Sequence, residues 1–137
     1  MARILLVEDS PAMRAFVRAA LEGIPALGSD MDIVEAASGF DALRLLPRGS
    51  YDLVITDINM PDINGLEVVR FVRKSERHQE IPLLIISTQS SERDRDRGLA
   101  LGADGFLAKP FTPEELRLAV LQCLARRLPP DALRSRA

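Results

Sequence analysis

The sequence predicts an α/β fold: one doubly wound, parallel five-stranded sheet, (βα)5, with helices on both faces. Short apolar runs alternate along the chain with longer stretches in which apolar residues recur at helical spacing. The short runs contain few polar residues, which is typical of strands that are buried on both faces of a sheet. The regular alternation of the two kinds of segment therefore favours a parallel sheet covered by helices.

The first half of the chain is expected to contain three strands and two helices. Strands are predicted at residues 4–7, 33–36 and 52–56, and helices at 11–22 and 39–46. The first strand is wholly apolar and ends at two acids. Ser10 and Pro11, which follow, are residue types preferred at a helix N-cap and in a first helical turn. A connection over 23–32, which contains Pro25 and Gly28, leads to the second strand.

The second half of the chain repeats this alternation. A loop is predicted at 61–65. A third helix follows it, indicated by apolar residues on one face, and the helix leads into a polar segment at 74–80. Strands are predicted at 83–86 and 105–108, and helices at 90–101 and from residue 112 onward. Pro82 stands at a strand start, where a missing N–H is tolerated, and Gly102 is typical of a helix end.

Size, charge and composition narrow the functional classes. A chain of 137 residues is long enough for one domain, which we expect at 1–128, followed by a loose tail at 129–137. The formal net charge of −2 gives no basic field, so direct nucleic-acid binding is not expected. The single cysteine cannot form an internal disulfide, and no apolar run approaches the roughly 20 residues of a membrane helix. We therefore expect a soluble, cytoplasmic protein without membrane insertion.

Polar side chains follow four of the five predicted strands. Glu8 and Asp9 come after the first strand, Asp57 after the third, Ser87 after the fourth and Lys109 after the fifth. The carboxyl ends of parallel strands meet at one edge of the sheet, where ligands bind in open α/β folds. The sequence therefore predicts that three carboxylates, a hydroxyl and an ammonium group gather in one pocket.

The charges of this pocket predict its chemistry. Two carboxylates about 5 Å apart repel each other by about 3 kcal/mol at an effective dielectric constant near 20, so the pocket must bind a cation or hold protons. Oxygen donors with room for water suit Mg²⁺, with Mn²⁺ as an alternative ion. A carboxylate in such a site can act as a nucleophile and form an aspartyl-phosphate. Asp57 is the best candidate, because its strand is expected to be central.

At these positions the sequence resembles the receiver domain of two-component response regulators. The motifs that carry the resemblance lie at 7–10, 57–61 with Gly65, 85–87, 103–106 and 109–111. Each motif alone is weakly specific, but together, in this order and spacing, they are highly specific and span about residues 2 to 127. Residues 10–14 are similar to the chemotaxis subgroup. The resemblance implies a flavodoxin-like strand order 2-1-3-4-5.

The resemblance also implies roles for the residues at the strand ends. Mg²⁺ would be held by Glu8, Asp9 and Asp57, with the main-chain carbonyl of Asn59 as a further ligand. A sensor histidine kinase would phosphorylate Asp57 from a phosphohistidine. Lys109 would then hold the phosphoryl group, and its peptide bond to the following proline is expected to be cis.

For the output, the resemblance implies a switch between two states that exist before phosphorylation. Ser87 would move to bond the phosphoryl group, and Phe106 would rotate inward to fill the vacated space. A strand phenylalanine is more usually part of the core, so both interpretations of Phe106 stay open. The face formed by the fourth helix, fifth strand and fifth helix is expected to bind a downstream protein. We expect a monomer or a weak dimer.

Three positions near the site are expected to set the lifetime of the phosphoryl group. Thr88 stands where the family usually has a small Ala or Gly, and its bulk would crowd an attacking water. Asn59 and Gln89 occupy two variable positions that the resemblance associates with dephosphorylation, and both carry an amide.

Three further features are expected to be structural. His78 lies in the polar segment at 74–80, with no cysteine or other histidine near it in sequence, and is expected to be solvated. Cys123 lies on an apolar stripe and is expected to pack as a small hydrophobe. The alternating charges at 92–97 are expected to form the solvated face of the fourth helix, with a partner contact there as the alternative.

The favoured interpretation is that the chain is a single-domain response regulator. It is expected to be a phosphoacceptor switch that assists its own phosphorylation and dephosphorylation, and not an enzyme. A degenerate receiver that binds partners without phosphorylation is one alternative. Another is a phosphatase of the haloacid-dehalogenase type, but that family has a first-strand Asp-x-Asp, whereas Asp57 follows the third strand, and this length leaves no room for a cap domain. A third alternative is the receiver half of a larger regulator, although the chain ends seven residues after Pro130.

Overall fold

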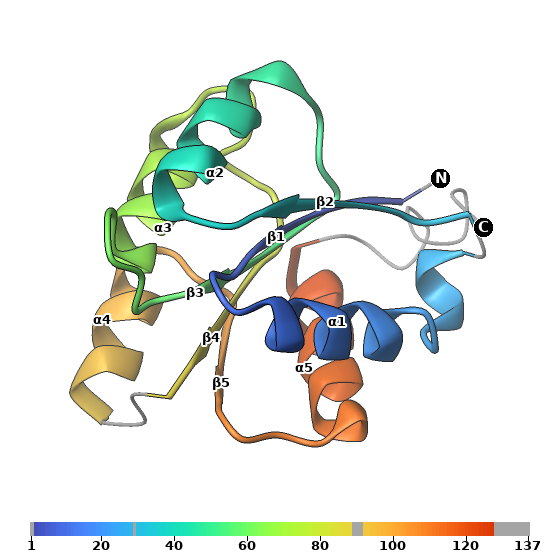
Figure 1. Ribbon diagram of the computed structural model, residues 1–137. Coiled ribbons are helices and arrows are strands. Elements are labelled where there is room, and N and C mark those ends of the chain that lie inside the picture. The colour runs from blue at the N-terminus through green and yellow to red at the C-terminus, as the bar shows by residue number, and fades with distance from the viewer. Residues whose placement is uncertain (1, 29, 89–91, 128–137) are drawn as a thin grey trace.

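The computed structural model describes residues 2–28, 30–88 and 92–127, which form a five-stranded parallel sheet (Figure 1). The strands are β1 (Arg3–Val7), β2 (Asp32–Ala36), β3 (Leu53–Asp57), β4 (Leu83–Ser87) and β5 (Gly105–Ala108). They lie in the order β2-β1-β3-β4-β5, which confirms the predicted fold class and strand order. Since β1 and β3 are neighbours near the centre, their ends lie side by side.

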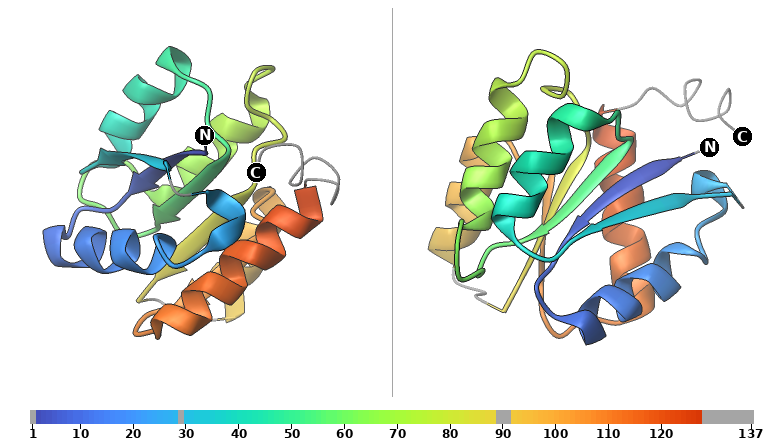
Figure 2. Two further views of the ribbon diagram at one scale, coloured as in Figure 1. Left: turned by 90° about the vertical axis from the view of Figure 1, so that its right-hand side faces the viewer. Right: turned by 45° about the horizontal axis from the view of Figure 1, so that its top comes forward.

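Helices cover both faces of this sheet, as Figure 2 shows from two further directions. They are α1 (Pro11–Leu21), α2 (Gly39–Leu45), α3 (Gly65–Lys74), α4 (Glu92–Leu101) and α5 (Pro113–Arg127), with 3-10 turns at Pro25–Leu27 and Leu46–Arg48. Helices α1 and α5 pack on one face, whereas α2, α3 and α4 pack on the other. Among the helices that the structure describes, none has the length and apolar character needed to cross a bilayer.

The sheet separates two hydrophobic cores. Alternate residues of each central strand point to opposite faces. In β1, for example, Ile4 and Leu6 enter the core under α1 and α5, whereas Leu5 and Val7 enter the core under α2 and α3. All four side chains are fully buried. Burial on both faces explains why the strand sequences are almost continuously apolar.

The helix starts follow from the residues before them. The Ser10 hydroxyl accepts a hydrogen bond from the Met13 N–H at 3.2 Å, and Pro11 is the first residue of α1, as the sequence predicts. Asn64 caps α3 by accepting from the Leu66 N–H at 2.8 Å. These caps fix where each helix leaves its loop, and so fix the loops that carry the polar residues.

The connection between α1 and β2 has a structural role. Its Pro25–Leu27 turn places the side chains of Ile24 and Leu27 in the core beneath α1 and α5, where they are 2% and 4% exposed. Burying an aliphatic side chain of this size stabilises a fold by about 1.5–3 kcal/mol. The two side chains therefore close the end of this core.

The prediction that His78 is solvated is wrong. The side chain is 2% exposed, and its ring lies 6.4 Å from the ring of Tyr51, centroid to centroid. Its main chain forms a turn, because the His78 N–H donates to the Ser75 carbonyl and the His78 carbonyl accepts from the Ile81 N–H, both at 3.1 Å. This turn directs the ring inward, although most neighbours in sequence are polar.

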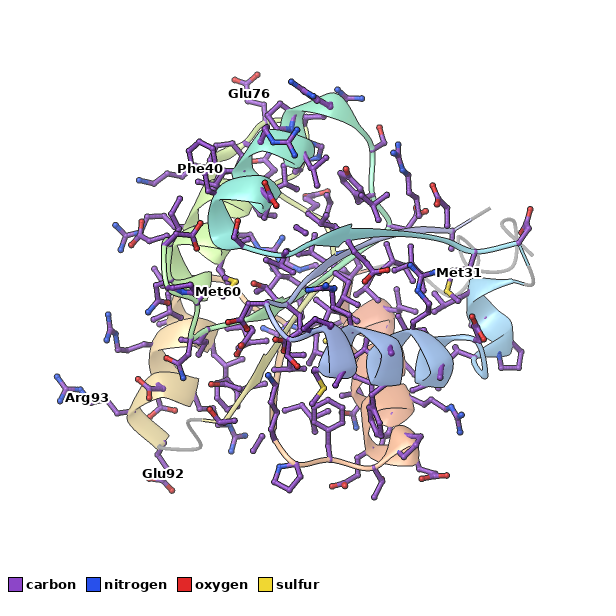
Figure 3. The ribbon with its side chains drawn as sticks, viewed as in Figure 1. Met31, Phe40, Met60, Glu76, Glu92 and Arg93 are labelled. Carbon is purple, nitrogen blue, oxygen red and sulfur yellow. The ribbon has the colours of Figure 1, made fainter. Side chains whose placement is uncertain are left out.

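Two other predictions concern the charged helix and the tail. In α4 the charged residues 92–97 are largely exposed, and Figure 3 shows Glu92 and Arg93 extending away from the sheet, as expected of a solvated face. The buried residue of α4 is Gly98, which approaches Ile85 of β4 closely. The predicted loose tail at 129–137, and Gln89, lie outside the described residues.

Candidate functional site

The predicted polar residues meet at one edge of the sheet. The pairing register sets Val7 beside Thr56. It also sets Asp57 beside Ile86 and Ser87 beside Ala108, so that the central strands end in step. Asp57 is the last residue of β3, one position later than the predicted strand end. The side chains that end or follow β1, β3, β4 and β5 are therefore brought to one place, as the sequence predicts.

Three carboxylates form the centre of this site. Glu8, Asp9 and Asp57 each offer an oxygen, and these oxygens all lie within 4.8 Å of one another. Glu8 is fully buried and Asp57 is 4% exposed, whereas Asp9 is exposed. The buried Oδ1 of Asp57 has no hydrogen-bond partner among the described residues. An unpaired carboxylate oxygen beside two further acids fits a small divalent cation with oxygen ligands.

Lys109 supplies positive charge to the same site. Its Nζ donates to Oε1 of Glu8 at 2.5 Å and lies 3.5 Å from Oδ2 of Asp57, and the side chain is 10% exposed. The other Glu8 oxygen, Oε2, accepts from the Ser10 N–H at 2.9 Å. The peptide bond between Lys109 and Pro110 is cis, as expected.

Burial dominates the electrostatics of the two inner acids. It raises the pKa of Asp57, against the opposing charge of Lys109 and the nearby N–H groups of Asn59 and Ile58. Burial also raises the pKa of Glu8, against its hydrogen bonds with Lys109 and the Ser10 N–H. Both acids are therefore more basic than ordinary carboxylates, and a further cation would favour their ionised forms.

A close approach of two main-chain segments shapes the loop after Asp57. A Cβ atom added to Gly65 would lie 1.9 Å from the Asp57 carbonyl oxygen, so only glycine fits there. The Gly65 N–H also donates to the Ile58 carbonyl at 2.9 Å. Farther along the loop, Asp62 accepts from the N–H groups of Gly39 and Phe40 at 3.3 and 2.9 Å, which ties the loop to the start of α2.

The remaining predicted residues surround this centre at different depths. Ser87 is fully buried at the end of β4, and its carbonyl accepts from the Lys109 N–H at 2.8 Å. Thr88, which follows Ser87, and Asn59, in the loop after β3, are exposed. Phe106 is partly buried against the core beneath α2 and α3, so it is neither fully packed nor fully free.

Sequence reasoning did not assign a role to Arg14, which contacts the site through the main chain. Its Nη1 donates to the Glu8 carbonyl at 2.7 Å, and its Nε donates to Glu35 at 2.9 Å. The available signal was its position one helical turn after the Ser10 cap, which places it beside the end of β1. Its partner Glu35, on β2, is distant in sequence, and that pairing has no local signal.

Comparisons with known proteins agree with this geometry. The family model described as the response regulator receiver domain matches residues 4–121. The chemotaxis protein CheY homolog of Campylobacter jejuni is 34% identical over 116 residues, which cover 84% of this chain and 86% of that protein. The solved structure of the chemotaxis response regulator CheY4 of Vibrio cholerae aligns with a TM-score of 0.75 and 34% identity, covering 93% of this chain and 99% of that one.

A third relative is much longer than this chain. The sensor histidine kinase TmoS of Ectopseudomonas mendocina is 35% identical over 132 residues, which cover 96% of this chain. The chain spans 13% of the length of that kinase. The same kind of domain therefore occurs both in short proteins and as one part of a long one.

Proposed function

This chain belongs to the response regulator receiver family, and we propose that it is a switch in two-component signalling whose Asp57 is phosphorylated by a histidine kinase. Receiver domains are phosphoacceptor switches that bind Mg²⁺ through an acidic cluster and interact with histidine kinases and downstream targets. The observation that supports the proposal best is the buried Oδ1 of Asp57, which has no hydrogen-bond partner among the described residues, in a carboxylate close to Glu8, Asp9 and Lys109.

The acidic cluster is the proposed metal site. Glu8, Asp9 and Asp57 would hold Mg²⁺, or alternatively Mn²⁺. The main-chain carbonyl of Asn59 would be a further ligand. When bound, the ion supplies positive charge that reduces the repulsion between these carboxylates and an incoming phosphoryl group. Because burial raises the pKa of Glu8 and Asp57, protons and the ion compete for the same oxygens.

Asp57 is the proposed nucleophile. One of its carboxylate oxygens forms a bond to phosphorus while the phosphorus–nitrogen bond of the donor phosphohistidine breaks. The electron pair of the broken bond stays on the leaving imidazole nitrogen. Lys109, which donates to Glu8, also donates to a phosphoryl oxygen, and the positive charge of Lys109 offsets the new negative charge. A bound cation favours the ionised, nucleophilic form of Asp57 against the burial that raises its pKa.

The proposed output follows from the residues around the phosphoryl group. The Ser87 hydroxyl moves to donate to it, and Phe106, which is only partly buried, rotates toward the vacated space. Phosphorylation thereby shifts a population between two states, and the face of α4, β5 and α5 binds a downstream protein. Thr88, Asn59 and Gln89 set the lifetime of the aspartyl-phosphate.

The process served by this switch is proposed from the relatives. Chemotaxis proteins of similar length, in Campylobacter jejuni and Helicobacter pylori, support a role like theirs for this chain. The long sensor kinase TmoS supports a second candidate, in which this domain works as the receiver part of a larger protein. In both cases the chemistry at Asp57 is the same.

Phosphorylation from a small donor tests the proposal directly. The purified chain is incubated with Mg²⁺ and acetyl phosphate, and intact mass spectrometry counts the phosphoryl groups. We expect one group per chain, which is lost in Asp57→Asn and when Mg²⁺ is chelated. Asp62→Asn, an acid of the same loop that caps α2, is the matched control and should still be labelled. A folded wild-type chain that is never labelled would contradict the proposal.

A further inference from the structure

We propose that Arg14 is a positioning residue for metal binding, which fixes the peptide between Glu8 and Asp9, and that Glu35 holds Arg14 in place. The inference rests on the proposed function, since it takes Glu8 and Asp9 to be metal ligands. The contact of Arg14 is with the main chain of Glu8, so Arg14 acts through the acidic pair rather than as a ligand itself.

Two hydrogen bonds fix the main chain of Glu8 just beyond β1. Its N–H donates to the Ala36 carbonyl at 3.0 Å, at the end of the neighbouring strand β2. Its carbonyl accepts from Nη1 of Arg14 at 2.7 Å, and the Arg14 side chain is only 19% exposed. A hydrogen bond from a charged donor is shorter and stronger than one between neutral groups. Glu8 is therefore held on both sides of its Cα atom.

The hydrogen bond from Arg14 also determines the orientation of the peptide that leads into Asp9. The carbonyl of Glu8 and the N–H of Asp9 belong to one planar peptide unit. Fixing that carbonyl therefore fixes the direction in which the chain continues into Asp9. Asp9 is exposed, so packing contributes little to its position. Without Arg14, water would satisfy the carbonyl, and the peptide between Glu8 and Asp9 would lose this restraint, leaving the hydrogen bond of the Ser10 N–H to Glu8 on its far side.

Glu35 holds the guanidinium group of Arg14 from the side of β2. Its Oε1 accepts from Nε of Arg14 at 2.9 Å, and its Oε2 accepts from Nη2 of Arg18 at 2.5 Å. Both arginines lie on α1, and so the carboxylate joins this helix to the strand beside β1. Its negative charge also offsets that of Arg14, which would otherwise oppose a cation at the acidic cluster.

Positioning and simple electrostatics predict opposite effects of removing Arg14. A positive charge near a metal site weakens cation binding, so its removal would strengthen binding if charge alone mattered. If Arg14 positions the acids, its removal weakens binding instead. Loss of residues that orient metal ligands typically weakens metal affinity by about 10- to 100-fold, and we expect a loss of about tenfold.

Titration of the full chain with MgCl2 at constant ionic strength, followed by the amide NMR signals, measures the Kd. We expect a Kd about tenfold higher in Arg14→Ala and in Arg14→Met, which retains a long side chain for packing. Arg14→Lys, which keeps the charge and an N–H donor, should recover most of the affinity. Arg18→Ala is the matched control, because Arg18 shares Glu35 but donates its other bond to Ile33, and its Kd should stay within twofold of the wild-type value.

The rate of labelling by acetyl phosphate gives a second readout. In Arg14→Met the Mg²⁺ concentration for half-maximal rate should rise about tenfold, while the rate at saturating Mg²⁺ stays unchanged. The inference is overturned if both neutral variants fold, as judged by thermal unfolding, and bind Mg²⁺ as tightly as Arg18→Ala or more tightly than the wild type. A wild-type chain that binds no Mg²⁺ would instead contradict the proposed function.

Discussion

Lys109 Nζ lies 2.5 Å from Oε1 of Glu8 but 3.5 Å from Oδ2 of Asp57. Lys109 is therefore bonded chiefly to an acid of the proposed metal site, while the proposed phosphoacceptor keeps one buried oxygen without a partner among the described residues. A metal ion and Lys109 would share Glu8. Since Nζ has three N–H donors and lies near both acids, Lys109 can contact Glu8 and a phosphoryl group on Asp57, which links metal binding to the later role of Lys109.

Replacing Lys109 should separate these two roles. In Lys109→Met we expect Mg²⁺ to bind about tenfold more tightly at pH 8, since a competing bond to a charged group, worth on the order of 1.5 kcal/mol, is removed. The rate of phosphorylation should nevertheless fall at least tenfold, because the charge on the phosphoryl group is no longer offset. NMR titration and intact mass spectrometry measure the two effects. Lys74→Met, an exposed lysine of α3, should change neither.

The raised pKa values of Glu8 and Asp57 predict how stability depends on pH. Burial is the main cause of both shifts, so folding favours the neutral acids when no metal is bound. Their contribution to stability is complete below the ordinary carboxyl pKa, near 4, and is lost as the pH rises through the raised values. Asp57→Asn resembles the neutral acid, and at pH 7.5 without Mg²⁺ its unfolding free energy should exceed that of the wild type by about 1 kcal/mol.

Asp62 provides a control of opposite sign for this experiment. The N–H of Phe40, followed by that of Ile63, lowers the pKa of Asp62, so its contribution is present above the ordinary carboxyl pKa and is lost as the pH falls through the lowered value. Asp62→Asn should therefore lower the denaturant midpoint at pH 7.5, where Asp57→Asn raises it. Urea unfolding at several pH values measures both. If Asp57→Asn is the less stable protein at pH 7.5, burial is not the dominant effect on Asp57.

Gly65→Ala tests the close approach beneath the phosphoacceptor loop. The added Cβ atom would meet the Asp57 carbonyl oxygen at 1.9 Å, and this main-chain atom cannot move without displacing Asp57 itself. We expect a loss of about 2–4 kcal/mol in unfolding free energy, and slower phosphorylation of the chain that remains folded. Gly23→Ala is the matched control, because the nearest neighbours of its Cβ atom would be atoms at the flexible end of the Arg117 side chain. Equal stability of the two variants would contradict the argument.

The polar residues at the strand ends could be predicted from sequence because short-range patterns carry the signal. A strand buried on both faces is an almost unbroken apolar run, so the first acid after it marks the carboxyl end. Glu8 and Asp57 were found in this way, and the parallel topology then brings them together without knowledge of any contact. This reasoning did not determine how deeply each side chain is buried. Phe106, for example, is partly buried, which fits neither a fully packed core residue nor a freely exposed one.

Features that depend on contacts between distant segments could not be predicted. His78 is buried by a turn that packs it against Tyr51, 27 positions earlier, and the polar residues around it suggested the opposite. Arg14, on α1, donates a hydrogen bond to Glu35, on β2. Ile24 and Leu27 close a core from a connection whose proline and glycines predicted only a loop. In each case the deciding partner lies outside the local pattern.

A buried ionic cluster lies at the opposite end of β5 from Lys109. The Asp104 carboxylate, which is fully buried, accepts from the Leu83 N–H and from Nη2 of Arg73, both at 2.9 Å. It also accepts from Nε of Arg127 at 2.6 Å. This single side chain therefore joins α3, the start of β4 and the last turn of α5.

Removing Asp104 should destabilise the fold without affecting the site. In Asp104→Ala the guanidinium of Arg73, whose pKa burial already lowers, loses its charge partner, and we expect a loss of about 3–5 kcal/mol in unfolding free energy. Asp41→Ala, which breaks an exposed pair with Arg44, should cost no more than about 1 kcal/mol. Urea unfolding compares the two variants. Under conditions where Asp104→Ala is folded, its Kd for Mg²⁺ should equal the wild-type value, since Asp104 precedes β5 and the acidic cluster lies beyond the other end of the sheet.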